Sequence, residues 1–517
     1  MTVRMVPTVL GKRSVQELYG LRWPRPLPIF QPPYRSVPLS RAYASVQGEP
    51  NKSQEPRSNS NPQSTPSSRA SEDGSASSSG HSTSGQQTPS AGSSSSSQTK
   101  FDWEENPDLS ISKFSELPSK NFGVNQHMII NEEFKEALRQ ILWQFKAPIR
   151  YAFAYGSGVF PQSTATTGGS STLHPSPPEA ITKVQQGNQK MIDFIFGVSY
   201  TQHWHSLNLQ QHRDHYSALG SLGSYAVSKV QDSFGAGVYF NPYITVNGVL
   251  VKYGVVNLDT LCKDLSEWNT LYIAGRLQKP VKILRDNPSV RLANQVNLIS
   301  AVRTALLLLG DDFTERELYS TIAGISYMGD PRMSVGGDDP RKVDNIVSNQ
   351  LPNFRRLYAP LIDNLPNITF NDSATADRDW MDDPSVNARL AQNMDPETRG
   401  HMVRRLPSAF REKLYFEYQS KFEITRRDFK KLMAETKEDD PDRIRKREGG
   451  PFEQRIAKDV EGGGLREEVQ QVITKTIQWP ATTQSLKGIV TSGVGRSLRY
   501  MREKREKNKK GKEPKEN

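Results

Sequence analysis

The sequence has only one cysteine, Cys262, among 517 residues. A single thiol excludes internal disulfides and any metal site that is built from several cysteines. Long apolar runs are missing as well. The best candidate, residues 298–309, is interrupted by Arg303 and Thr304, and it is too short to cross a bilayer, which takes about 20 residues. We therefore expect any membrane role of this protein to be peripheral.

Large apolar side chains are missing from residues 46–100, which contain no Leu, Ile, Met, Phe, Tyr or Trp and consist mainly of Ser, Gly, Gln, Pro and Thr. Such a segment cannot bury enough apolar surface to offset the entropy that it would lose on ordering. The composition predicts a disordered linker over residues 46–120, with the folded part beginning near Asn121.

A basic face for nucleic acid is not indicated, although the net charge is +11. Residues 1–45 and residues 495–517 each carry an excess of six positive charges, which leaves the body of the chain close to neutral. Because DNA or RNA binding depends on cations spread over the binding face, we expect no nucleic-acid partner.

The first 45 residues are rich in Arg and almost free of acid, which is typical of a mitochondrial presequence. Arg41, followed by Ala42 and Tyr43, fits a processing site. The alternative is an unstructured basic tail, which the Pro-rich stretch at residues 24–38 favours.

A strand that ends in small residues is the first chemical signal. Residues 149–155 are apolar and aromatic and predict a strand, which follows a helix that Asn131 would cap. The strand ends in Gly156, Ser157 and Gly158, where small residues let the backbone approach a ligand closely. Alone, this tripeptide predicts little more than a tight turn.

An acid and a cation lie in the strands that follow. Residues 191–198 are apolar except for Asp193, which is costly there unless it is paired or holds a metal. Residues 236–246 and 248–256 predict a hairpin, because Asn247-Gly248 supplies the positive φ angles of a type I′ turn. Alternation along the second strand of the hairpin places Lys252 on the face opposite Tyr253.

These residues occur in the order that nucleotidyl transfer requires. Such an enzyme grips a triphosphate, neutralises its α-phosphate with Mg²⁺ and aligns an attacking oxygen. The nucleotidyltransferase superfamily uses a strand that ends in Gly-Ser and acids on the next strand, and Gly156, Ser157 and Asp193 match that order. The superfamily usually shows Asp-x-Asp, whereas residue 195 is Ile. A further metal ligand must therefore come from elsewhere, or fewer ions bind.

Further blocks follow in order between residues 122 and 361. They are FAYGSGV at 153–159, IDF at 192–194, WH at 204–205 with Asn208, HYS at 215–217, GAGVY at 235–239, KYGV at 252–255, LYIAGRLQKP at 271–280 and GD at 329–330. Together they resemble the mitochondrial phosphatidate cytidylyltransferase family, also called the translocator assembly and maintenance family. The ten residues at 271–280 are the most specific block.

The resemblance implies an α/β (α+β) fold, in which a nucleotidyltransferase domain with a mixed sheet at 121–285 precedes a winged-helix-like helical domain at 286–361. It also implies that CTP and phosphatidate react to CDP-diacylglycerol and pyrophosphate on the matrix side of the mitochondrial inner membrane, which feeds cardiolipin and phosphatidylglycerol synthesis. A homodimer is left open.

The resemblance also assigns roles to residues. The nucleotide would be held by Tyr155, Gly156, Ser157, Gly158, Arg276 and Lys279. The catalytic residues would be Asp193, Lys252 and Asp330, with Mg²⁺, the only expected cofactor, bound by Asp193. For Arg276 and Lys279 the alternative is a solvated loop.

Half of the eight histidines lie within residues 203–215. This density suggests zinc, but apart from Asp214 no nearby acid or cysteine completes a ligand shell. Because His205 and His215 belong to the family's blocks, we expect them to orient substrate. Structural hydrogen bonding is the alternative.

The second half of the chain is predicted to be mainly helical. Residues 290–309 predict a buried helix, and Thr314 with Glu317 forms a capping box for another. A helical region with a polar insert at 436–464 is expected over residues 362–481. In the first domain, residues 163–187 are rich in Ser, Thr, Gly and Pro and predict a mobile surface loop.

The C-terminal segment, residues 482–517, predicts an amphipathic membrane-binding helix with a basic tail. Its apolar stripe has spacings of three and four and consists of Leu486, Ile489, Val490, Val494, Leu498 and Met501. Lys487, Arg496 and Arg499 border the stripe, so we expect binding to anionic lipids of the inner membrane. The alternative is packing of this helix onto the enzyme itself.

Two other functions remain open at this point. The same fold could transfer a nucleotide to RNA or to a protein side chain, although the near-neutral body argues against RNA. Alternatively, an inert nucleotidyltransferase fold could be a matrix-side scaffold that supports protein import, a reading favoured by Ile195 in place of the usual second acid.

Overall fold

The computed structural model describes residue 103 and residues 109–162, 174–185, 190–334, 339–435, 449–460, 463–493 and 495. The presequence predicted for residues 1–45 and most of the linker predicted for 46–120 lie outside these residues, as does most of the predicted basic tail. The described part of residues 95–517 forms one compact unit.

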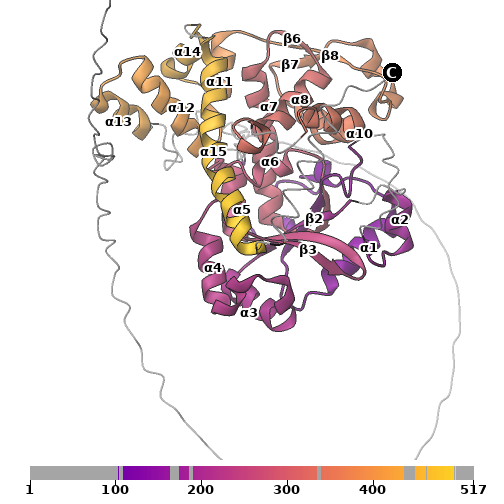
Figure 1. The fold of residues 1–517 in the computed structure, drawn as a ribbon. Coiled ribbons are helices and arrows are strands. Elements are labelled where there is room, and N and C mark those ends of the chain that lie inside the picture. Colours follow the sequence, from indigo (N-terminus) through magenta and orange to yellow (C-terminus); the bar gives the residue numbers. More distant parts are fainter. Residues whose placement is uncertain are drawn as a thin grey trace, which may run out of the picture. The chain divides into compact units, whose positions relative to one another are not determined.

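A mixed five-stranded sheet lies at the centre of the first domain (Figure 1). In spatial order its strands are β3 (Val238–Val246), β4 (Val249–Asn257), β2 (Ile192–Val198), β1 (Tyr151–Tyr155) and β5 (Lys282–Arg285). Strands β2 and β4 run parallel, and the other neighbours are antiparallel. The predicted mixed sheet is thus confirmed. The predicted hairpin is confirmed too, since Asn247 and Gly248 both have positive φ.

Helices cover both faces of this sheet. One face carries α3 (Thr201–Gln211) and α4 (Gly223–Ser233), whereas α5 (Leu258–Glu267) packs on the other, where two of its leucines, Leu258 and Leu261, contact Gly197 of β2 (Figure 1). Helix α1 (Glu132–Trp143) begins at the predicted cap, because Asn131 accepts a hydrogen bond from the amide of Phe134. The short helix α6 (Ala274–Leu277) lies between α5 and β5 in the chain.

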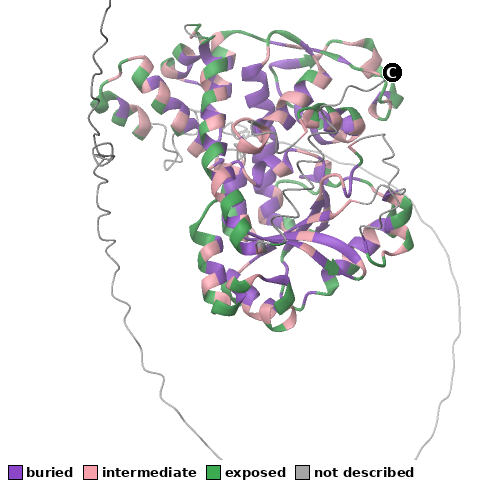
Figure 2. Cartoon of the chain, viewed as in Figure 1, coloured by how far each residue is buried: buried purple, intermediate pink, exposed green. Residues whose placement is uncertain are grey.

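Helix α7 (Pro288–Leu308) is buried along nearly its whole length, as its apolar sequence predicts (Figure 2). Helix α8 (Glu315–Ile325) starts at the predicted capping box of Thr314 and Glu317. It packs against α7 and α10 (Lys342–Ile362), and the short helix α9 (Pro331–Ser334) lies between α8 and α10 in the chain. A fully buried ion pair between Glu315 and Arg355 joins α8 to α10.

The second part of the molecule also contains a sheet. Its three strands, in spatial order, are β6 (Asp312–Thr314), β8 (Arg389–Gln392) and β7 (Ile368–Phe370), all antiparallel. Two of them lie beyond residue 361, so this sheet joins the predicted second domain to the region that the sequence predicted as helical. Helices packed beside a small antiparallel sheet are compatible with a winged-helix-like domain, which stays a prediction.

The described residues of the C-terminal region add five α-helices. They are α11 (Pro396–Arg404), α12 (Ser408–Lys421), α13 (Arg426–Glu435), α14 (Pro451–Ala457) and α15 (Gly464–Ser492). Helix α15 packs on β3 of the first domain and on α7 and α12. Among the described residues, no helix is both long enough and apolar enough to span a membrane.

One prediction about the first domain is corrected. Residues 163–187 were expected to form a mobile surface loop, but residues 179–185 form helix α2 (Glu179–Gln185), and His174, Ile181 and Gln185 are buried. The polar composition hid a short helix that buries one apolar side chain, Ile181, and one hydrogen-bonded polar side chain, Gln185. Residues 163–173, 186–189 and 436–448 lie outside the described part.

Candidate active site

Three neighbouring strands bring Tyr155, Asp193 and Lys252 into one row. Tyr155 lies opposite Asp193 across β1 and β2, and Asp193 lies opposite Lys252 across β2 and β4. Directly opposed residues share a face of a sheet, so the three side chains lie on the same face. Lys252 Nζ is 3.3 Å from Asp193 Oδ1, and these side chains are 17% and 25% exposed. The structure thus brings together the acid and the cation that the sequence singled out.

The turn after β1 requires glycine at two positions. Gly156 has a φ of +79°, which favours glycine, and a Cβ on Gly156 would lie 3.5 Å from Asp193 Oδ2. A Cβ on Gly158 would lie only 2.7 Å from the carbonyl oxygen of Met191. The amide of Phe160 closes the turn by donating to the carbonyl of Gly156 at 2.9 Å. This geometry sets the Gly156-Ser157-Gly158 backbone directly beside the Asp193 carboxylate.

Two buried residues that the sequence did not single out brace this turn. Gln185 Nε2 donates to the carbonyls of Gly158 and Lys190, both at 3.0 Å. His174 Nδ1 accepts from the amide of Leu250 at 3.0 Å, so its Nε2 carries the proton and donates to Gln185 Oε1 at 3.1 Å. Burial lowers the pKa of His174, which keeps the ring neutral as this arrangement needs. Helix α2 thereby ties the turn to β4.

The block at 271–280 starts from a strained backbone. Leu271 is buried at a φ of +55°, a conformation that costs a non-glycine residue about 1–3 kcal/mol. The buried carboxylate of Asp264 holds the segment, because it accepts hydrogen bonds from the amides of Thr270 at 2.9 Å, Ile273 at 2.9 Å and Ala274 at 3.1 Å. Asp264 therefore fixes the start of α6, the helix that carries Arg276.

Arg276 and Lys279 follow one turn apart at α6 and extend the row of charges. Arg276 Nε lies 3.4 Å from the hydroxyl of Tyr155, and its guanidinium lies 4.0 Å from the ring centre of Tyr272. Lys279 Nζ donates to Ser326 Oγ at 2.8 Å. Burial, and then the positive charges of Arg276 and Lys342, lower the pKa of Lys279 to about 7. Both cations are partly buried, which argues against the solvated loop considered for them.

Asp330 lies in the loop after α8, and its carboxylate is engaged by a neighbouring arginine. Arg332 Nε lies 3.0 Å from Asp330 Oδ1, and Arg332 Nη2 lies 2.5 Å from Oδ2. Asp330 is 3% exposed. These contacts favour a role in holding Arg332, and the catalytic role of Asp330 stays a prediction.

The histidines predicted to orient substrate belong to a buried network. His205 Nδ1 lies 2.8 Å from the hydroxyl of Tyr216, and its Nε2 lies 2.8 Å from Gln231 Oε1. Burial lowers the pKa of His205 to about 4, so its ring is neutral. His215 Nδ1 lies 2.8 Å from the hydroxyl of Tyr253. Tyr253 follows Lys252 on β4, so its side chain points to the opposite face of the sheet from the lysine predicted to be catalytic. These contacts favour the alternative of structural hydrogen bonding.

The zinc hypothesis finds a partial ligand set. His212, Asp214 and His215 place one ligand atom each within 4.8 Å of one another. The rings of His212 and His215 are stacked in parallel, however, with centres 4.3 Å apart. Lone pairs of two stacked imidazoles run side by side and do not converge on one ion at the roughly 2.0 Å that zinc requires.

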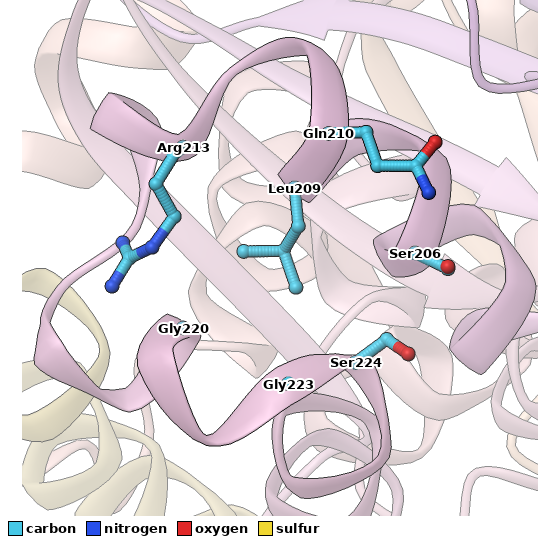
Figure 3. A pocket seen from close by; sticks show the side chains of 7 residues that line it. All are labelled: Ser206, Leu209, Gln210, Arg213, Gly220, Gly223 and Ser224. Atoms are coloured by element: carbon cyan, nitrogen blue, oxygen red, sulfur yellow. The ribbon is translucent and has the colours of Figure 1, made fainter.

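A pocket of about 260 Å³ lies on the same side of the sheet as these histidines (Figure 3). Residues of α3, of the 3-10 turns that follow it and of the start of α4 line it, namely Ser206, Leu209, Gln210, Arg213, Gly220, Gly223 and Ser224. Arg213 Nη1 donates to the carbonyl of Ser217 at 3.2 Å, so the guanidinium braces the pocket wall. None of the residues predicted for catalysis lines this pocket.

The end of α15 presents an apolar surface to solvent. Its exposed side chains are Leu486 at 61%, Ile489 at 41% and Val490 at 56%. This end of the helix docks through a polar face instead, formed by the buried residues Gln484, Lys487 and Thr491, whereas the earlier turns of α15 bury apolar side chains. Lys487 was expected to border the lipid-facing stripe. That expectation was wrong, because its ammonium caps the end of α4 by donating to the carbonyl of Phe234 at 2.7 Å. Val494, Leu498 and Met501 lie outside the described residues.

Comparison with known proteins gives one consistent result. Residues 138–507 match the family described as mitochondrial phosphatidate cytidylyltransferase. The protein of that name from Schizosaccharomyces pombe is 41% identical over 286 residues, which cover 55% of this chain and 67% of the relative. The one from Saccharomyces cerevisiae is 43% identical over 265 residues, 50% of this chain and 63% of the relative. The one from Xenopus laevis is 35% identical over 364 residues, 70% of this chain and 91% of the relative.

Proposed function

The chain belongs to the mitochondrial phosphatidate cytidylyltransferase family, and we propose from this membership that it transfers the cytidylyl group of CTP to phosphatidate. An oxygen of the phosphatidate phosphate would form a bond to the α-phosphorus of CTP, while the bond from that phosphorus to pyrophosphate breaks. The products are CDP-diacylglycerol and pyrophosphate. The observation that carries this proposal is the family match over residues 138–507, which includes every residue of the row from Tyr155 to Lys279.

The geometry of the row supports a division of roles. The backbone of Gly156 and Ser157 approaches the Asp193 carboxylate closely and would grip the triphosphate through amide and hydroxyl groups. Lys252 lies beside Asp193, and Arg276 lies beside Tyr155. Both cations would stabilise the negative charge that builds up on the phosphates. Burial, and then the charge of Asp193, raise the pKa of Tyr155, so its hydroxyl stays protonated and can donate to a phosphate oxygen.

Asp193 has the chemistry to hold Mg²⁺. Mg²⁺ takes oxygen ligands and is commonly bound by one or two carboxylates together with substrate phosphates and water. The Asp193 side chain is 25% exposed at the end of β2, beside the turn proposed to grip the triphosphate. When bound there, Mg²⁺ would neutralise charge on the phosphates. Ile195 cannot add a ligand, because its hydrocarbon side chain has no donor atom, and it is fully buried in the core.

The outward apolar end of α15 supports peripheral membrane attachment. At this end of α15 the buried face is polar and Leu486, Ile489 and Val490 are exposed, which suits insertion into the surface of a bilayer. We place the enzyme on the matrix side of the mitochondrial inner membrane, bound to anionic lipids, where its product would feed phosphatidylglycerol and cardiolipin synthesis.

One assay tests the function. The purified chain is incubated with Mg²⁺, phosphatidate vesicles and each of the four nucleoside triphosphates, and lipid-linked nucleotide is measured. We expect CDP-diacylglycerol from CTP. If RNA or protein is offered as well, transfer of the labelled nucleotide to it, without formation of CDP-diacylglycerol, would favour another acceptor. Absence of both nucleotidyl transfer and Mg²⁺-dependent CTP binding would favour the alternative that the protein is a non-enzymatic scaffold for protein import.

A further inference from the structure

The second domain brings another cation to the row of charges. Two ammonium groups lie near the ring of Tyr327, the residue just after α8. Lys279 Nζ lies 5.1 Å from the ring centre, and Lys342 Nζ lies 5.2 Å from it. Lys279 lies two residues after the end of α6, whereas Lys342 is the first residue of α10. Two parts of the chain that are far apart in sequence therefore aim like charges at one place.

The positive charges of Lys279 and Lys342 repel each other, and an anion bound between them would offset this repulsion. The charged groups that act most on Lys279 are Arg276 and Lys342, and both are positive. Lys279 donates to two neutral oxygens, the hydroxyl of Ser326 and the carbonyl of Gly275. These bonds orient its ammonium group without neutralising it. An ammonium group that is oriented but not neutralised by these bonds is suited to binding an anion such as a phosphate.

We propose that Lys342, together with Lys279 and the ring of Tyr327, forms a subsite for a phosphate group of a substrate. The proposal deepens the proposed function and rests on it for the identity of the substrates. The phosphate comes either from the triphosphate of CTP or from the phosphomonoester of phosphatidate. The tyrosine ring keeps the two ammonium groups partly desolvated through cation–π contacts, which strengthens their attraction to a phosphate.

The close contact of α6 with the end of α8 makes the subsite a defined place. A Cβ on Gly275 would lie 2.3 Å from the Cβ of Ser326, so α6 and Ser326 meet with no room for a methyl group. Lys279 and Tyr327 are thereby held at a fixed separation. Lys342 completes the subsite from α10, which packs against α8.

Kinetics of the full chain test the subsite. Lys342→Gln removes the charge but keeps most of the side-chain length, and Lys263→Gln, at an exposed position of α5, is the matched control. We expect Lys342→Gln to raise KM for one substrate about tenfold, because a charge-assisted contact is lost. Lys342→Arg should keep KM close to the wild-type value. A raised KM for CTP assigns the subsite to the triphosphate, and a raised KM for phosphatidate assigns it to the lipid phosphate. Unchanged KM values for both substrates overturn the proposal.

Calorimetry separates this proposal from the proposed function. Inorganic pyrophosphate and glycerol 3-phosphate are titrated into the wild type, Lys342→Gln and Lys263→Gln, after circular dichroism has shown that all three are folded. Weaker binding of either probe to Lys342→Gln alone supports the subsite even if the wild type forms no CDP-diacylglycerol. Equal binding of both probes to all three proteins overturns the subsite, whatever the outcome of the enzyme assay.

Discussion

The carboxylate of Asp264 accepts a hydrogen bond from the amide of Ile273 at 2.9 Å and so fixes helix α6, which carries Arg276 and is followed closely by Lys279. Asp264 touches none of the expected reacting groups and is a positioning residue. Its partners are all backbone or hydroxyl donors at the start of α6, where the chain passes through a strained conformation. The charge pattern of the active site thus depends on an acid about ten residues earlier in the chain.

Asp264→Asn should lower kcat/KM about 10- to 100-fold in enzyme that is still folded. The amide keeps one acceptor oxygen but turns a donor toward α6, so contacts worth about 1.5–3 kcal/mol are lost and the cations shift. Steady-state kinetics well below the melting temperature measure the effect. Asp259→Asn, exposed on the same helix, is the control. A wild-type kcat/KM in folded Asp264→Asn would show that α6 does not need this anchor.

Asp193→Asn should abolish turnover and the Mg²⁺ dependence of CTP binding, because a neutral amide is a poor Mg²⁺ ligand. The melting temperature should change little, since the pair with Lys252 is partly exposed and pairs of this kind contribute about 0–1 kcal/mol. Calorimetry with CTP, with and without Mg²⁺, provides the measurement, and Asp311→Asn on the surface is the control. Turnover at the wild-type rate would refute the metal assignment.

Lys279→Met should change the pH dependence of stability. In the folded enzyme the pKa of Lys279 is lowered to about 7 from 10.5, so the unfolded chain binds more protons between these two pH values. The destabilisation by this lysine is complete below about pH 7 and disappears as pH rises toward 10.5. The melting temperature of Lys279→Met relative to wild type should therefore be highest at pH 6–7 and fall toward pH 9.5. A difference that is independent of pH would contradict the lowered pKa.

His205→Gln should destabilise the protein without a specific effect on catalysis. The substitution disturbs buried hydrogen bonds to Tyr216 and Gln231, at a cost of about 1–3 kcal/mol for each group left unpaired. Thermal melting and active-site-normalised kcat, measured at low temperature, distinguish the two effects. A large loss of kcat with an unchanged melting temperature would instead support the substrate-orienting role predicted from the sequence.

Replacing Leu486, Ile489 and Val490 together by Ser should release the protein from anionic vesicles while its activity on detergent-dispersed phosphatidate persists. These side chains are exposed, so the substitutions remove apolar surface available to lipid and little of the core. Co-sedimentation with vesicles of phosphatidylcholine and cardiolipin measures binding. Val460→Ser, at a still more exposed apolar position away from α15, is the control. If the triple variant sediments as the wild type does, the end of α15 is not the attachment site.

Local patterns predicted much of the first domain. Local apolar patterns predict the strands that carry Asp193 and Lys252 and the strand that ends at the Gly-Ser-Gly turn. Alternation is enough to place Lys252 on the face opposite Tyr253. The cap at Asn131 and the capping box at Thr314 are equally local, since the side chain and its partner amide lie three residues apart.

What could not be predicted depends on contacts between distant residues. His174 and Gln185 look like parts of a polar insert until β4 and the turn after β1 supply their partners. Lys487 reads as a lipid-facing cation, and only the end of α4 shows why it is buried. Tyr327 and Lys342 have no motif of their own, because their role arises where α8 and α10 meet α6.

The contact between Gly275 and Ser326 leaves no space for slippage between the two parts of the enzyme. A phosphate that bridges Lys279 and Lys342 would bind only while Gly275 and Ser326 are in contact. Phosphate binding and this contact are therefore thermodynamically linked. Substrate should then protect both parts against heat together and raise a single cooperative melting transition. The contact between α6 and Ser326 is therefore expected to be intact whenever Lys279 and Lys342 bind one phosphate together.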